Sequence, residues 1–332
     1  MSSTLTTRAA WYEKNGEARD VMLLGSLPLK APGAGEVCVR LAASGVNPSD
    51  VKSRRAKPLS DPWVVPHSDG AGTIEAVGEG VSKQRVGERV WIWNAQWQRP
   101  HGTASEFIVL PATQAVKLPD NTDFAAGACM GIPGLTAVQA VHLAGNENLR
   151  GKKVLVTGAS SAVGHYITQM VTHYGGQVIG TVGSEQKAVH AKAAGAVETI
   201  FYKTEPVLER LKAFSGGRGV DVMIDMDFAT ASKWVTQGGL APHGQLIGYG
   251  SNVVGDIPLT FRPLLFNSIG LKFFLVYDLL PADRTWCVNR TSELLAAGQL
   301  KHTIGAHFSL DQIVQAHEAV EAGQLGNVVI DL

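Results

Sequence analysis

A stretch of small residues between Val156 and Tyr166, VTGASSAVGHY, has the composition of a loop that binds a pyrophosphate. In such loops one glycine allows a tight turn, a second lets the phosphates approach the backbone, and a third lets the helix pack on the strand. In that register the three positions are Ala159, Ser161 and Gly164. The Ser161 hydroxyl can donate a hydrogen bond to a phosphate, and the following helix supplies free N–H groups. We expect a variant dinucleotide loop, with an ordinary strand-to-helix turn as the alternative.

The residues after the next predicted strand, QVIGTV, bear on which nicotinamide dinucleotide is bound. Sites for NADH usually place an acid there, which binds the ribose 2′-OH. The strand ends at Val182, which cannot accept that bond, whereas Lys187 and Tyr202 follow further along the chain. A cation and a hydroxyl without an acid favour a 2′-phosphate, and hence NADPH. Glu185 is the contrary feature, and a solvated helix position is the alternative interpretation of Lys187.

The elements that must position these residues form two predicted regions. Up to about residue 125, segments rich in valine, isoleucine and aromatics alternate with glycine and proline, which predicts a β-rich, partly barrel-like domain. From Lys152 onward, apolar strands alternate with helices, which is typical of a doubly wound parallel sheet covered on both faces. A helix at about 282–297 and a final helix and strand complete this α/β protein.

Composition excludes several classes of protein. The 332 residues suit two domains, and with 45% hydrophobic and 17% charged residues they predict a well-buried globular protein. Basic and acidic residues both number 29, so no electrostatic footprint for nucleic acid or an anionic membrane is expected. The sequence contains no apolar run of transmembrane length, and its start does not resemble a secretory signal. The three cysteines lie far apart, and a cytoplasmic enzyme is the expectation.

Several segments together resemble the medium-chain dehydrogenase/reductase superfamily, and in particular its zinc-free branch, the zeta-crystallin-like NADPH:quinone oxidoreductases. They include LAASGVNPSD (41–50), DGAGTIEAVGEGV (69–81), GIPGLTA (131–137), VLVTGASSAVG (154–164), VIGTVGSEQK (178–187) and FSLDQIVQAHEAVEAG (308–323). The resemblance covers nearly the whole chain. It implies a GroES-like catalytic domain formed by residues 1–125 and 271–332, a Rossmann NADP-binding domain at 126–270, and an active-site cleft between them.

The resemblance also implies which residues form the site. At the nicotinamide side it implies Asn47 and Asp50, with Tyr249, Gly250 and Ser251 flanking the ring. At the phosphates it implies Thr136, Ser161, Ala162 and Val163, and around the 2′-phosphate Gly183, Lys187 and Tyr202. Asn327, a further expected cofactor contact, stands where the family often has a lysine. Ser161 and Ala162 depart from the usual loop, and Asp227-Phe228 departs from the usual D-S-V-G turn.

The same comparison bears on metal binding. Where zinc members have a metal-binding cysteine and histidine, this chain has Asn47 and Ser68, with Asp69 in the place of a glutamate. His67 lies one residue early, where glycine is usual, and we expect a turn histidine there and not a ligand. A catalytic zinc needs three protein ligands in tight geometry, so no metal is expected.

Without a Lewis acid, the expected acceptors are those that take a hydride unaided, and NADPH-dependent quinone reduction is the main hypothesis. Asn47, Asp50, Trp97 and Tyr249 are the candidate catalytic residues; Trp97 could form an aromatic slot, although tryptophans more often pack in cores. The proton donor stays open among Tyr249, Tyr277, His101 and solvent. The alternatives are an enone or alkenal double-bond reductase and a non-catalytic NADPH-binding crystallin or sensor protein.

Assembly is the last expectation from sequence. The apolar segment SIGLKFFLVY (268–277) is predicted to form a strand near the edge of the second sheet. Exposed apolar edges tend to be covered, and a symmetric pairing of two copies is the economical way to do so. The family resemblance also implies a homodimer.

Overall fold

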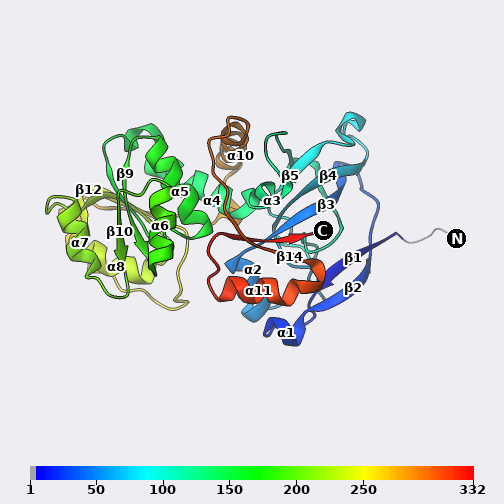
Figure 1. Cartoon of the computed structure of the whole chain (residues 1–332), viewed down its shortest axis with the longest axis horizontal. Coiled ribbons are helices and arrows are strands. Elements are labelled where there is room, and N and C mark those ends of the chain that lie inside the picture. Colours follow the sequence, from blue (N-terminus) through cyan, green and yellow to red (C-terminus); the bar gives the residue numbers. More distant parts are fainter. Residues whose placement is uncertain (1–4) are drawn as a thin grey trace. The chain divides into compact units, whose positions relative to one another are not determined.

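The computed structural model describes residues 5–332, and the chain crosses between two folded units (Figure 1). Of the described residues, the first unit contains 5–134 together with Val288–Leu332, and the second contains Leu135–Cys287. The boundaries expected from sequence, after residues 125 and 270, lie earlier in the chain than these.

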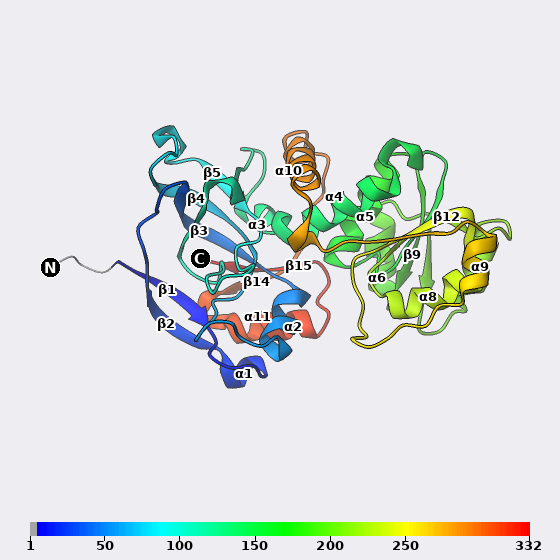
Figure 2. The same ribbon diagram turned by 180° about the vertical axis from the view of Figure 1, so that it is seen from behind.

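The first unit is built on a sheet in which the C-terminal strand lies beside an early one (Figure 2). Its order is β14-β15-β3-β4-β5-β7, and β6 also pairs with β3. The strands are β3 (Glu36–Val46), β4 (Asp69–Val77), β5 (Arg89–Ile92), β6 (Phe107–Pro111), β7 (Ala115–Lys117), β14 (Ile304–Ser309) and β15 (Asn327–Asp331). All of the pairs are antiparallel except β14 with β15. A separate hairpin pairs β1 (Thr6–Trp11) with β2 (Leu23–Pro28).

Two helices of this unit matter for the site. Helix α2 (Pro48–Ala56) begins directly after β3, because Pro48 fits the first helical turn, where its missing N–H is not needed. Helix α11 (Ile313–Glu321) packs against α2, and β15 follows it. The C-terminal segment therefore supplies both a helix and a strand to the surroundings of α2.

The second unit has the strand order expected of a dinucleotide-binding sheet. All of its strands are parallel, in the order β10-β9-β8-β11-β12-β13. They are β8 (Lys153–Val156), β9 (Gln177–Val182), β10 (Glu198–Phe201), β11 (Val220–Asp225), β12 (Leu240–Gly248) and β13 (Gly270–Phe273). The order reverses between β8 and β11, and ligands of such sheets bind at the carboxyl ends of the strands at that point. The predicted doubly wound α/β fold is confirmed.

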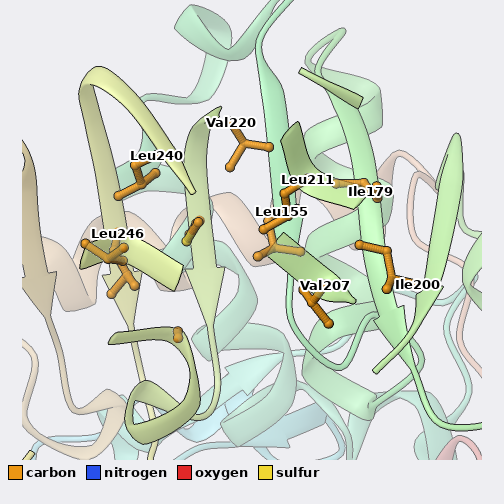
Figure 3. Packing of buried hydrophobic residues seen from close by; sticks show 11 residues of the cluster. Leu155, Ile179, Ile200, Val207, Leu211, Val220, Leu240 and Leu246 are labelled. Atoms are coloured by element: carbon orange, nitrogen blue, oxygen red, sulfur yellow. The ribbon is translucent and has the colours of Figure 1, made fainter. Parts of the chain in front are cut away.

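Helices follow most of these strands, and apolar side chains fill the space between them and the sheet (Figure 3). The helices are α4 (Leu135–Ala144), α5 (Ala162–His173), α6 (Glu185–Ala193), α7 (Val207–Phe214), α8 (Phe228–Thr236) and α9 (Phe261–Phe266), and α10 (Pro281–Ala296) runs from this unit into the first. Leu155, Ile179 and Ile200 come from three adjacent strands and are fully buried together with Leu211 of α7. Because burial of such a side chain contributes roughly 1.5–3 kcal/mol, this core holds the strand ends in register.

The last strand of this sheet is shorter than the sequence suggested. β13 contains only Gly270–Phe273 of the apolar segment 268–277. Ser268 precedes it with φ of 51°, and the chain turns into a short helix at Val276–Asp278, so neither flank can continue the ladder. β13 does form the edge of the sheet, as expected. Within residues 5–332, no helix has the length and apolar composition needed to cross a membrane.

Candidate active site

The loop between β8 and α5 has the geometry of a phosphate-binding turn. Gly158 has φ of 62°, so the tight turn is made one residue before the Ala159 position expected from the G-x-G-x-x-G spacing. A Cβ on Gly164 would lie 2.2 Å from the carbonyl oxygen of Gly158, which means that only glycine lets α5 approach the strand this closely. The Gly158 N–H donates to the hydroxyl of Thr181 at the end of β9, at 2.9 Å. The loop is thereby tied to two neighbouring strand ends.

Ser161 is the N-cap of α5. Its hydroxyl oxygen accepts a hydrogen bond from the N–H of Gly164 at 3.0 Å, which leaves the hydroxyl hydrogen available to donate. Ser161, Ala162 and Val163 are partly exposed at the start of the helix. Free N–H groups and the positive end of the helix dipole favour an anion there, so these residues fit a dinucleotide pyrophosphate.

The residues expected around a 2′-phosphate gather at the end of β9. A Cβ on Gly183 would lie 3.4 Å from the Tyr202 hydroxyl, so Tyr202, which is 51% exposed, covers that glycine. Lys187 lies in the first turn of α6 and is half-buried. Among residues 5–332, Lys187 has no carboxylate at ion-pair distance, so its charge is not neutralised within the chain. Val182 at the strand end is buried and provides no acid.

The segment after β12 contains Tyr249, Gly250 and Ser251. Backbone hydrogen bonds join it to the end of β11 and the turn that follows. The Phe228 N–H donates to the Gly250 carbonyl at 3.2 Å, and the Tyr249 N–H donates to the Asp225 carbonyl at 3.0 Å. The Asp227 carboxylate accepts from the N–H of Asn252 at 3.1 Å and from a threonine hydroxyl of α8. The unusual Asp227-Phe228 pair therefore joins two turns at the carboxyl edge of the sheet.

A buried acid that the sequence analysis did not propose as a site residue lies at the same edge. The Thr157 hydroxyl donates to Asp225 at 2.7 Å and accepts from the Met226 N–H at 2.8 Å, which joins the ends of β8 and β11. Burial raises the pKa of Asp225 to about 6. The Tyr249 hydroxyl is buried, and burial together with Asp225 raises its pKa, so Tyr249 is a poor proton donor in this conformation. The available signal was a threonine directly after one buried strand and an aspartate at the end of another.

Three other predicted site residues lie in separate elements. Thr136 is buried near the start of α4. Asn327 begins β15, and its side-chain amide donates to the Thr303 carbonyl at 3.1 Å, so that amide is engaged within its own unit. Trp97 is half-buried, and the ammonium of Lys57 lies 5.2 Å from its ring centre. The proximity indicates a cation–π contact.

In the first unit, Asn47 is held between two buried carboxyl groups. As the N-cap of α2, its N–H donates to the Asp50 carboxylate at 2.8 Å, and its side-chain amide donates to the Asp69 carboxylate at 2.7 Å. The other oxygen of Asp69 accepts from the Ile132 N–H at 3.2 Å. Burial raises the pKa of Asp50 to about 7, and burial with the nearby Asp50 charge raises that of Asp69 further above its usual range. The structure thus brings Asn47 and Asp50 together and adds Asp69.

His67 is fully buried in a hydrogen-bond chain with a defined direction. Its φ of 77° is a conformation that favours glycine. The Thr103 hydroxyl donates to the Asp69 carbonyl at 2.6 Å, so the Ser44 hydroxyl, 2.8 Å away, must donate to Thr103. His67 Nδ1 then donates to Ser44 at 2.8 Å, and neutral His67 Nε2 accepts from His317 Nε2 at 3.0 Å. One carbonyl therefore determines both histidine tautomers.

Both histidines resist protonation. Burial lowers the pKa of His67 well below its usual value, and the neighbouring His317 adds to this effect. Burial and the positive charge of Arg54 lower the pKa of His317 to about 3. Arg54 is itself fully buried and forms an ion pair with Glu321, one helical turn after His317 on α11. No group of three or more histidine, cysteine or acidic side chains in residues 5–332 has the geometry of a metal site.

Known proteins match both units. The alcohol dehydrogenase GroES-like domain family matches residues 33–120, and the zinc-binding dehydrogenase family matches residues 162–293. A quinone oxidoreductase of Pseudomonas aeruginosa is 36% identical over 301 residues, which cover 88% of this chain and 89% of that protein. A 2-haloacrylate reductase of a Burkholderia species is 29% identical over 341 residues, covering 97% of this chain and 98% of that protein. A mycobacterial protein solved in complex with NADPH is 27% identical, with a TM-score of 0.86, and the match covers 98% of this chain and 100% of that one.

The buried histidine pair predicts a loss of stability in acid. In the folded state His317 stays neutral down to a pH of about 3, whereas in the unfolded chain it takes up a proton near pH 6.5. Its contribution is therefore present above pH 6.5 and lost as the pH falls towards 3. In His317→Gln the amide can still donate to His67. We expect the stability advantage of the wild type over this variant to shrink by about 2 kcal/mol between pH 7 and pH 5.

Urea unfolding at the two pH values measures this difference. The matched control is His173→Gln, which replaces an exposed histidine of α5 and should leave the pH dependence of stability as in the wild type. An identical pH dependence in His317→Gln and the wild type would show that His317 is protonated in the folded state as easily as in the unfolded one.

Proposed function

The chain belongs to the zeta-crystallin-like quinone oxidoreductase family of the medium-chain dehydrogenases/reductases, and we propose that it reduces a quinone with NADPH without a catalytic metal ion. The family establishes an NAD(P)H-dependent oxidoreductase with a GroES-like and a Rossmann-type domain. The observation that carries the finer proposal is the extent of the match to a protein named quinone oxidoreductase, at 36% identity over 88% of this chain. Lys187 in the first turn of α6, which has no carboxylate at ion-pair distance among residues 5–332, supports NADPH in particular.

The cofactor would be held by the second unit. Ser161 and the N–H groups of Ala162 and Val163 would bind the pyrophosphate, since they begin a helix at the point where the strand order reverses. Lys187 and Tyr202 would bind the 2′-phosphate. When bound, NADPH supplies a hydride. The protein would orient the two reactants and exclude water from them.

The side chains at the metal-ligand positions of zinc members support a reaction without zinc. The Asn47 amide donates to Asp69, and Ser68 presents a hydroxyl, whereas catalytic zinc in proteins is held by cysteine, histidine and carboxylate ligands. These two residues do not fit such a site. Asn47, Asp50, Trp97 and Tyr249 remain the proposed residues of the substrate side, with Gly250, Ser251 and Thr136 beside the cofactor.

Reduction of an activated carbon–carbon double bond is the second candidate. The observation that favours it is the full-length similarity to a protein named 2-haloacrylate reductase, at 29% identity. A quinone and an unsaturated carbonyl compound both accept a hydride at a carbon conjugated to a carbonyl group. The same placement of the cofactor would therefore serve either acceptor.

Turnover of NADPH by the purified protein tests these proposals. We expect NADPH absorbance to fall on addition of a simple quinone, and product analysis with an enone and with 2-haloacrylate separates the second candidate from the first. If the protein does not oxidise NADPH with several quinones but reduces the carbon–carbon double bond of an enone, the second proposal replaces the first. Tight NADPH binding without turnover of any acceptor would indicate a non-catalytic crystallin-type or sensor protein.

Lys187 should determine the preference between the two cofactors. Loss of a charge-assisted hydrogen bond costs about 1.5–3 kcal/mol, so Lys187→Ala should weaken NADPH binding roughly ten- to hundredfold and leave NADH binding nearly unchanged. Dissociation constants from nicotinamide fluorescence measure both. Lys192→Ala, on the exposed side of the same helix, is the matched control. Equal weakening of NADH and NADPH would contradict a role in binding the 2′-phosphate.

We also propose that a second copy of the chain covers the apolar edge of the second unit. Exposed apolar side chains cluster in the segments at and around α9 and β13, namely Phe261, Leu265, Phe266, Phe273, Leu275 and Leu280. Among the strands of residues 5–332, β13 pairs only with β12, so its outer edge is also open. A symmetric homodimer would bury both features.

The three cysteines are free and buried, which agrees with a proposed location in the reducing cytoplasm.

Light scattering coupled to size-exclusion chromatography should give the mass of a dimer. Phe266→Glu places a charge on a side chain that is 73% exposed in the single chain, and we expect it to shift the protein to monomer. Val189→Glu makes the same change on an equally exposed residue of α6 and should remain a dimer. A monomeric wild-type protein would refute the proposal.

A further inference from the structure

Asp69 is the point at which the buried polar groups of the first unit meet. Its carboxylate accepts hydrogen bonds from the Asn47 side chain and the Ile132 N–H, at 2.7 and 3.2 Å. Its carbonyl accepts from Thr103, the end of the chain of hydroxyl and imidazole groups that begins at His317. The side chain is fully buried, so it has no solvent to replace any of these donors.

Two glycines make room for this carboxyl group. A Cβ on Gly131 would lie 2.5 Å from the Cβ of Asp69, and a Cβ on Gly45 would lie 3.0 Å from Asp69 Oδ1 and 2.3 Å from the Ala128 carbonyl oxygen. Distances under 3.0 Å are closer than non-bonded carbon and oxygen atoms approach. The surrounding backbone therefore encloses the carboxyl group closely, and Asp69 cannot relieve a poor hydrogen bond by moving away.

The two donors determine the orientation of the Asn47 amide. Asp69 uses one oxygen for each N–H, so the Asn47 side chain must present its NH₂ group to Asp69. A flipped amide would place its carbonyl oxygen against a carboxylate oxygen. The N–H of Asn47 is meanwhile held by Asp50. Both the backbone and the side chain of Asn47 are thus fixed by buried acids.

We propose that Asp69 is a positioning residue of the active site, which acts by fixing the orientation of the Asn47 amide. This inference rests on the proposed function, in which Asn47 stands at the nicotinamide side of the site. Asp69 itself is enclosed and touches neither cofactor nor acceptor in this role. Its effect on the reaction passes through Asn47 alone.

The isosteric change Asp69→Asn tests hydrogen-bond polarity without changing volume. An asparagine has one acceptor oxygen and one NH₂ group, so it cannot accept from both Asn47 and Ile132. In one orientation the NH₂ group of the new asparagine faces the Ile132 N–H, so two donors meet. In the other orientation it faces the Asn47 NH₂ group, and the Asn47 amide must flip. We expect kcat to fall at least tenfold with a smaller change in KM for NADPH. Glu75→Gln, an exposed acid on the same strand, is the matched control and should leave kcat unchanged.

A double-mutant cycle separates positioning from a general structural effect. If Asp69 acts through Asn47, Asp69→Asn should change kcat less than twofold in an Asn47→Ala background. Equal losses in both backgrounds would overturn the proposal, as would an Asp69→Asn variant that behaves like Glu75→Gln. The exchanged pair, Asn47→Asp with Asp69→Asn, restores all of the donors and acceptors. It should recover the thermal stability lost in the single variants but not their kcat.

A spectroscopic readout keeps this test independent of the proposed activity. The NH₂ resonances of Asn47, assigned by their loss in Asn47→Asp, report the hydrogen bond to Asp69 in the protein without cofactor. They should exchange slowly with water in the wild type and in Glu75→Gln, and should shift and exchange faster in Asp69→Asn. Unchanged resonances would refute the positioning role even in an active enzyme. Changed resonances in a protein that turns over no acceptor would instead count against the proposed function.

Discussion

The close approach of α5 to β8 is the constraint on which the candidate cofactor site depends. Gly164 allows it, since any side chain there would meet the carbonyl oxygen of Gly158. The approach places the first turn of the helix directly above the strand ends. Ser161 then caps the helix, and the N–H groups that remain unpaired point away from the sheet towards the anion they would bind. At the other two loop positions the chain has Ala159, which is fully buried, and Ser161, which caps the helix.

The first unit buries acids and histidines in its interior. Most of these groups are held by hydrogen bonds to neutral side chains and backbone groups, whereas the buried Arg54 forms an ion pair with Glu321, which also pairs with Arg55. A backbone carbonyl ends one hydrogen-bond chain and a backbone N–H ends another, so the direction of each hydrogen bond is determined. Networks of this kind stiffen a core, because exchanging any one partner leaves another group unpaired.

The sequence predicted the elements better than it predicted the contacts. β3 and β9 have the residues expected from their apolar runs, and the parallel sheet follows from the alternation of strands and helices. Asn47 and Asp50 were expected in one site because the family resemblance implies both at the nicotinamide side. Asp69 and His317 could not be connected to them by any local pattern, since the contacts are made by segments far apart in the chain. The length of β13 was overestimated, because an apolar run does not show where the backbone leaves the ladder.

The pairing of β15 with β3 has a consequence for how the protein is made. The strand that completes the first sheet contains residues 327–331, whereas every strand of the second unit lies before residue 274. On the ribosome the second unit can therefore form its core while the first still lacks the strands β14 and β15 and the helix α11. The unit that is translated first is therefore the one whose sheet is completed last. Until the C-terminal segment is made, β3 lacks its partner β15, and α2 lacks its packing partner α11. Because the first sheet needs residues 327–331, it can be completed only after the whole second unit has been synthesised.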